Sequence, residues 1–169
     1  MLKKSLNEFN HNVFKDIGEL CPILTAGDKK TGFNAMTVSW GGFGVLWGKN
    51  VCFLFVRKSR YTHKFTEESD NITLSFLTDE YKEAKTLFGK TSGRDVNKFE
   101  ASRLHPTYDF DYMGWYVKEA SYVLKLKKLY SMDIDYKLLP NDIRDKFYAD
   151  GDSHTMYVCQ ISQYLVNEE

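Results

Sequence analysis

Cysteine and proline are scarce in this sequence of 169 residues, with three copies of each. The cysteines Cys21, Cys52 and Cys159 are odd in number and lack CxxC spacing, so they give neither a disulfide framework nor a zinc signature. All three lie in apolar stretches, where a cysteine is usually a small buried hydrophobic residue. We therefore expect no metal site and a cytoplasmic protein in a reducing environment.

An excess of charge of either sign is also lacking. The 23 basic and 23 acidic residues cancel, and the basic residues are scattered. Nucleic acids and membrane surfaces are therefore not indicated as partners. The one dense basic run, Lys125–Lys128, alternates with apolar residues, and we expect it to form the solvent-facing side of a strand.

Long hydrophobic runs are absent, so the sequence predicts no membrane span. Residues 1–15 lack the apolar core of a signal peptide and are expected to form a loosely docked N-terminal arm. GxGxxG, HExxH and a Ser-His-Asp set are missing too, which leaves a Rossmann enzyme or a hydrolase without support.

Aromatic residues, by contrast, make up 15% of the chain, which suits strands or a site for a flat ring. Strand-like segments follow one another between turn signals, with few helices and no βαβ rhythm. This pattern predicts one mainly β domain over residues 1–169, an antiparallel barrel with a few short helices.

The segment 34–48, NAMTVSWGGFGVLWG, is the first candidate site element. We expect a strand over 33–40 with apolar and hydroxyl-bearing side chains on opposite faces. It runs into Gly41, Gly42 and Gly44, which indicates a sharp turn or a close approach to a flat ligand. The alternative is that Asn34 lies in a simple turn and that the Trp40 ring is part of the core.

A second element follows the apolar run 51–56, which reads as a strand buried on both faces. It ends in Arg57, Ser59, Arg60 and Thr62, which offer positive charge and hydroxyl donors at a helix start, where Ser59 is a candidate N-cap. Such a set suits a phosphate group. The alternative is a strand end held by salt bridges.

Together with a third segment, these elements resemble the flavin reductase/flavoredoxin family. The resemblance rests on the motifs at 34–47, 57–62 and 92–99, in that order, and extends from about Asp16 to about Leu165. It implies an FMN-binding split barrel with Greek-key topology. The chain departs from the family at Cys21-Pro22, where relatives carry an aromatic residue, and at Phe88-Gly89, where they often carry Cys-Gly.

The resemblance also implies which residues bind the cofactor. Taken alone, the 92–95 segment SGRD is only a helix cap, but in the family this loop closes over flavin and phosphate, with Lys98 near either. His154 is a candidate for the nicotinamide side, against the alternative of a structural histidine at the start of a strand. The implied cofactor-binding residues are Asn34, Met36, Thr37, Val38, Ser39, Trp40, Arg57, Ser59, Arg60, Tyr61, Thr62, Ser92, Gly93, Asp95, Lys98 and Phe99.

The activity implied by the resemblance is an NAD(P)H-dependent flavin reductase, in which NADH or NADPH gives a hydride to FMN. A homodimer and a redox protein partner are further implications. Two alternatives remain: a flavoredoxin-like electron carrier without a nicotinamide site, and a split-barrel binding protein that has lost its flavin. No catalytic acid or base is required for hydride transfer between stacked rings.

Overall fold

One strongly curved antiparallel sheet forms most of the molecule. The computed structural model describes residues 1–168. The strands are β1 (Leu2–Lys4), β2 (Ile23–Asp28), β3 (Gly32–Thr37), β4 (Gly41–Leu46), β5 (Lys49–Arg57), β6 (Asn71–Phe76), β7 (Pro106–Asp109), β8 (Gly114–Val117), β9 (Tyr122–Asp133) and β10 (His154–Val166).

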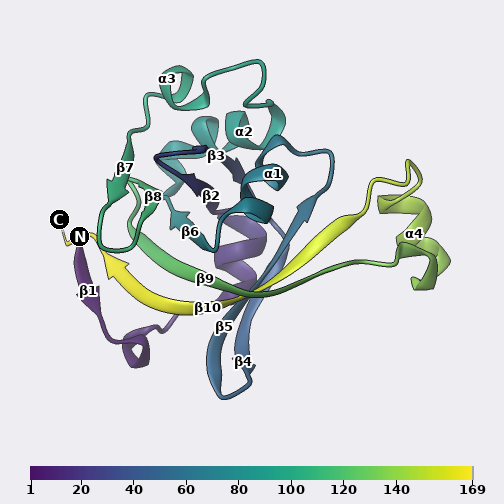
Figure 1. Cartoon of the computed structure of the whole chain (residues 1–169), viewed down its shortest axis with the longest axis horizontal. Coiled ribbons are helices and arrows are strands. Elements are labelled where there is room, and N and C mark those ends of the chain that lie inside the picture. The colour runs from purple at the N-terminus through teal and green to yellow at the C-terminus, as the bar shows by residue number, and fades with distance from the viewer. Residues whose placement is uncertain (169) are drawn as a thin grey trace.

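The helices are short and lie in the connections between strands. They are α1 (Tyr61–Glu68), α2 (Lys82–Lys90), α3 (Lys98–Ser102) and α4 (Asn141–Phe147). Figure 1 shows α1, α2 and α3 gathered on one side of the sheet and α4 standing away from it. Single turns occupy Leu6–Glu8, Asp79–Tyr81 and Tyr136–Leu138, and a π-helix occupies Phe14–Glu19. In the described part of the chain, no helix combines the length and the apolar character that crossing a membrane requires.

The main sheet runs in the order β3-β2-β6-β9-β10-β5-β4, and β1 joins the far end of β10. The long strand β10 pairs with β5 through residues 154–160 and with β1 through residues 164–166, while β9 follows it along its other side. All these pairs are antiparallel. The predicted mainly β, antiparallel barrel with a few short helices is confirmed.

The barrel closes around an apolar core. Leu54 from the predicted buried strand is fully inaccessible, as are Leu24, Leu74, Leu124 and Tyr157 from the neighbouring strands. A second, smaller cluster lies between β2 and β3 and the two helices α2 and α3, with Phe88 at its centre. Because α2 packs on β3 in this way, the end of α2 is brought beside the first candidate motif.

The N-terminal segment is docked more firmly than a loose arm. Residues 2–4 form a strand on β10, and the Phe9 ring lies 5.2 Å from the rings of Phe43 and Tyr164. The free thiols of Cys52 and Cys159 are fully buried, as expected, whereas Cys21 is half-buried.

Lys125 contradicts the expectation of a solvent-facing basic strand. Only 3% of the residue is exposed, because the β7–β8 hairpin brings Asp109 over it. Its ammonium nitrogen lies 2.5 Å from the Asp109 carboxylate and 2.9 Å from the side-chain oxygen of Gln163. Lys128 donates to the carbonyls of Thr66 and Glu67 instead of facing water alone. Lys125 and Lys128 thus tie β9 to its neighbours, whereas Lys127 is exposed, as expected.

The predicted strand 33–40 is shorter than expected. Strand β3 ends at Thr37, and Trp40 lies in the connection to β4 with 37% of its surface exposed, so it is not part of the core. Gly41 is required by the backbone: a Cβ atom there would lie 2.5 Å from the carbonyl oxygen of Phe53. This glycine therefore allows β4 to approach β5.

Candidate functional site

The three sequence motifs meet at one cavity of about 180 Å³. The first turn of α1 forms one wall, and the loop after α2 forms the opposite wall. Lys98, the first residue of α3, and Asn34, on β3, complete the lining. We call it the phosphate cavity. The predicted residues that line it are Asn34, Ser59, Arg60, Tyr61, Thr62, Ser92, Gly93 and Lys98.

Asn34 joins the three motifs physically. It is 9% exposed, and its amide nitrogen donates to the Thr62 hydroxyl oxygen at 2.9 Å. The loop with Gly93 lies directly against its side-chain oxygen, since a Cβ on Gly93 would be only 2.2 Å from that atom. Glycine at this position is therefore a condition for the loop to close on β3. Asn34 lies in a strand and not in a simple turn.

Two cations, Arg60 and Lys98, define the electrostatics of the phosphate cavity. Lys98 is 4% exposed and donates to the carbonyls of Ala35 and Phe88. Arg60 is half-buried and donates to the same Phe88 carbonyl at 3.1 Å. Within residues 1–168, neither cation has a carboxylate at salt-bridge distance.

Burial, and next the positive charge of Arg60, lower the pKa of Lys98 to about 8. Burial likewise lowers the pKa of Arg60. A cation removed from water without a counter-ion costs free energy, and two that repel each other cost more. The arrangement is therefore complementary to an anion, which would offset both terms. The first turn of α1 adds backbone N–H groups that have no partner within the helix.

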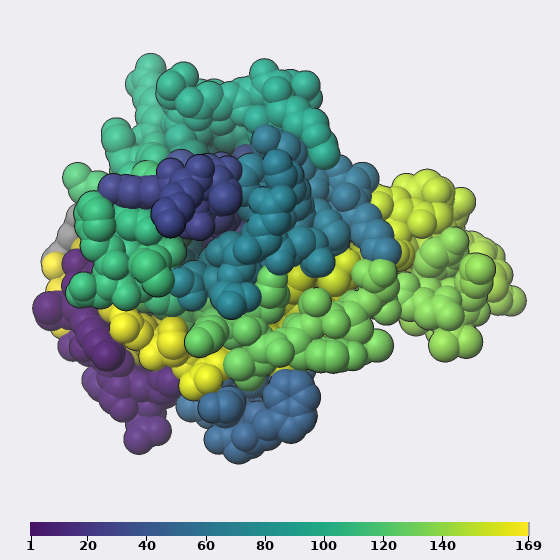
Figure 2. Space-filling view, viewed as in Figure 1, coloured from purple at the N-terminus to yellow at the C-terminus, as the bar shows by residue number. Residues whose placement is uncertain are grey.

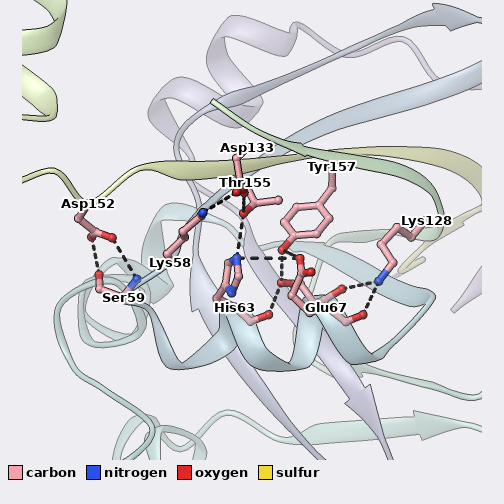
Figure 3. A network of polar contacts seen from close by, with 10 residues as sticks. Lys58, Ser59, His63, Glu67, Lys128, Asp133, Asp152, Thr155 and Tyr157 are labelled. Carbon is pink, nitrogen blue, oxygen red and sulfur yellow. Dashed lines mark hydrogen bonds and ion pairs between the residues drawn. The ribbon is translucent and has the colours of Figure 1, made fainter. Parts of the chain in front are cut away.

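A polar network fixes α1, and with it the position of these groups (Figure 3). His63 lies 2.9 Å from the Thr155 hydroxyl, which donates to Asp133 at 2.8 Å. Further along the helix, Glu67 accepts a hydrogen bond from the Tyr157 hydroxyl, and Thr66 donates one to it. Because Thr155 and Tyr157 belong to β10, the cavity wall formed by α1 is anchored to an interior strand of the sheet.

Arg57 and Ser59 are engaged by another part of the chain. Arg57 donates to the carbonyls of Asp152 and Phe147 at 2.9 and 2.7 Å. The backbone N–H and the hydroxyl of Ser59 both donate to the Asp152 carboxylate, at 3.1 and 2.5 Å. Ser59 is not the N-cap of α1, since that position belongs to Arg60. For these two residues the structure shows the strand end held by the 134–153 insertion.

A second cavity, of about 200 Å³, adjoins the first at Arg60, which lines both. We call it the ring cavity. Met36 and Val38 are buried and form part of its wall, whereas Ser39 and Trp40 are exposed. The Thr37 hydroxyl donates to the Lys85 carbonyl. The predicted residues that line the ring cavity are Met36, Thr37, Val38, Ser39, Trp40, Arg57, Arg60 and His154.

His154 is neutral at pH 7. Burial, and next the charge of Arg57, lower the pKa of its imidazole to about 4. The ring centroid lies 4.7 Å from that of Trp40, and Nδ1 lies 3.0 Å from the Tyr148 hydroxyl. His154 thus offers the ring cavity an uncharged, immobilised side chain.

The remaining predicted residues, Asp95 and Phe99, lie outside these two cavities and line a neighbouring one. Sequence reasoning in turn missed Lys90, Thr91 and Arg94, which line the phosphate cavity. Arg94 lies inside the 92–99 motif, and this position could have identified it as a lining residue. Lys90 and Thr91 carried none, because they mark only the end of α2.

Comparison with solved structures shows the same fold in several proteins. Flavoredoxin of Desulfovibrio vulgaris is 20% identical with a TM-score of 0.70, over 99% of this chain and 78% of that one. An FMN-binding protein from Thermus thermophilus is 16% identical with a TM-score of 0.67, over 88% of this chain and 72% of that one. A Shewanella frigidimarina protein described as having a split barrel domain is 15% identical with a TM-score of 0.70, over 88% and 67%.

The fold and the cavities thus define a split β-barrel protein with a basic cleft at the start of α1. Residues 17–169 match the Flavin reductase like domain, and the chain belongs to that family. A comparison with curated protein sequences finds no match.

Proposed function

We propose that this protein binds FMN and acts as an NAD(P)H-dependent flavin reductase. The observation that carries the proposal is the pair of sheltered cations, Arg60 and Lys98, without a carboxylate partner in the described chain. Family membership supports an oxidoreductase, and the Thermus thermophilus protein of the same fold is described as FMN-binding.

In this proposal the FMN phosphate occupies the phosphate cavity. Arg60 and Lys98 neutralise its charge, and the Thr62 hydroxyl and the first amides of α1 donate to its oxygens. Asn34 holds Thr62 in place from β3. Gly93 lets the loop with Ser92 close over the ligand.

The flavin ring then extends from Arg60 into the ring cavity. Met36 and Val38 provide apolar cover, and Trp40 and His154 provide an aromatic wall whose two rings are tilted by 36°. Bound flavin supplies the hydride chemistry, accepting from a nicotinamide stacked against it. The protein's own residues position the rings, set the local charge and exclude water.

The nicotinamide donor is given room by a third cavity, of about 590 Å³, which shares Thr37 with the ring cavity. Lys82 and Lys90 line it and suit the diphosphate of a dinucleotide. We assign His154 to positioning, because a side chain with a pKa of about 4 is not in its cationic, acidic form at pH 7.

A homodimer belongs to the same proposal, and exposed apolar side chains support it. Trp47 is 61% exposed at the tip of the β4–β5 hairpin, with Val45 beside it and the exposed Tyr130 ring of β9 at 6.4 Å between ring centroids. The hairpin projects from the body of the protein (Figure 2). Such a patch is typical of a surface covered by a partner. Sedimentation of the wild type and of Trp47→Lys tests this, and a monomeric wild type contradicts it.

The free thiols support the proposal of a cytoplasmic, reducing location, and electron transfer to a redox protein partner belongs to it as well. The test of the function is an absorption spectrum of the protein with FMN, recorded without air before and after adding NADH or NADPH. We expect a protein-bound flavin band that the nicotinamide bleaches.

Two other outcomes of this experiment identify the alternatives. A bound flavin that dithionite bleaches but neither nicotinamide does would show a flavoredoxin-like carrier. A protein that ignores added FMN would be a split-barrel binding protein that has lost its flavin.

A further inference from the structure

A fourth cavity, of about 490 Å³, opens beside the phosphate cavity, on the side where α3 begins. The two cavities share five lining residues, among them Asn34, Arg94 and Lys98. A ligand whose phosphate lies between Arg60 and Lys98 is therefore next to this space. FMN ends at its phosphate and would leave it unfilled.

The walls of this cavity are aromatic. Phe33, Tyr61, Phe65 and Phe99 line it. Phe33 is fixed by stacking on Trp115, with centroids 4.2 Å apart and planes at 15°, and the Phe99 ring lies 5.6 Å from it. Aromatic side chains held in place before binding are the usual platform for a nucleobase, because every base has a π-face.

The boundary between the two cavities is basic. The Arg94 guanidinium covers the Tyr61 ring at 4.8 Å and donates to the Ser59 carbonyl at 3.4 Å, so it stands at the cavity edge. With Lys98 it places two cations where a second phosphate would follow the first. The exposed side chains of Asp95 and Asn97 add polar groups that suit the edge of a base or a ribose hydroxyl.

From this juxtaposition we infer that the cavity binds the adenosine half of a flavin dinucleotide, so that the chain prefers FAD to FMN. The base lies against the aromatic wall, and the diphosphate crosses from Arg60 and Lys98 to Arg94. The inference rests on the proposed flavin site, and it adds a ligand subsite that FMN does not use.

The experiment compares dissociation constants for FMN and FAD by quenching of flavin fluorescence. We expect the wild type to bind FAD about tenfold more tightly, as one base–aromatic stack would give. Val96→Trp fills the cavity from a half-buried position and should remove this preference while FMN binding stays unchanged. Phe33→Leu keeps apolar volume but removes the ring, and it should reduce the preference.

Equal constants for FMN and FAD in the wild type would overturn the inference and leave the flavin site standing. So would an equal loss of both ligands in Val96→Trp and Phe33→Leu proteins that unfold like the wild type. If Val96→Trp instead raises the KM for NADH and leaves the FAD-to-FMN ratio intact, the cavity serves the nicotinamide donor and the inference is wrong. A wild type that binds neither flavin would refute both the inference and the proposed function.

Discussion

The two ends of the short motif 57–62 differ in the groups to which their side chains are bonded. Arg57 and Ser59 bond to the insertion between β9 and β10, through two carbonyls and the Asp152 carboxylate. Arg60 and Thr62, a few residues further, line the phosphate cavity, where the Arg60 guanidinium donates to the Phe88 carbonyl and meets no carboxylate of residues 1–168. Two arginines that look equivalent in the sequence thus have different surroundings, and the difference lies in whether the chain supplies its own anion.

The largest expected effect concerns flavin affinity. Arg60→Ala should weaken FMN binding by about 1.5–3 kcal/mol, or about 10- to 150-fold, because it removes a charge-assisted bond to the phosphate. Arg57→Ala is the matched comparison and should change affinity by less than about threefold, since its donors are already used. Fluorescence titration measures both, and similar losses in the two variants would erase the distinction between the two ends.

The loss of folding stability should rank the same two variants in the reverse order. Arg57→Ala leaves the carbonyls of Phe147 and Asp152 without their donor and should lower the free energy of unfolding by about 1–3 kcal/mol. Arg60→Ala should cost less, because it also relieves the repulsion with Lys98. Urea unfolding of both proteins without flavin is the measurement. An Arg60→Ala protein less stable than Arg57→Ala would count against the assignment.

Lys98 adds a dependence on pH. In the free protein its pKa is about 8, so it is mostly charged at pH 7 and loses its proton as the pH rises further. Since the phosphate binds the charged form, the dissociation constant of FMN should rise above pH 8 by up to about tenfold per unit. Titrations at pH 7, 8 and 9 test this. Lys98→Gln should bind more weakly and show no such slope.

The smallest effect is expected for Asp152→Asn. The substitution weakens the bonds from Ser59 and the more distant contact with Arg57 at 3.7 Å, so unfolding should become easier by about 0.5–1 kcal/mol. FMN affinity should stay within about twofold of the wild type. A tightening well beyond that would mean that Ser59, once released, binds the phosphate and that the two ends are less separate than they look.

Local patterns in the sequence were sufficient for much of the fold. The C-terminal segment 154–166 is predicted to form the last strand, and β10 has these bounds. The continuous apolar run 51–56 predicts a strand covered on both faces. One face, with Cys52, Leu54 and Val56, is fully inaccessible, whereas Phe53 and Phe55 on the other face are half-buried. Periodicity reports such features because they depend on neighbours in the chain.

Features that depend on distant partners could not be predicted in this way. Asp152 lies more than ninety positions from Ser59, so nothing near the motif shows that its hydroxyl is already bound. Lys125 reads as a solvent-facing residue until the β7–β8 hairpin places Asp109 on it. The convergence of the three motifs came from the family resemblance. That Arg57 lies outside the phosphate cavity, and that Ser59 lines it with its hydroxyl already bonded to Asp152, needed the coordinates.

The position of β10 has a consequence for folding during synthesis. This strand follows all the others in the chain, yet it lies in the middle of the sheet, between β9 and β5. A nascent chain that lacks it would leave the edges of both neighbours unpaired, which invites aggregation. Thr155 and His154 also belong to it, so the anchoring of α1 and one wall of the ring cavity arise only once synthesis has passed these residues. Flavin capture should therefore be among the last events of folding.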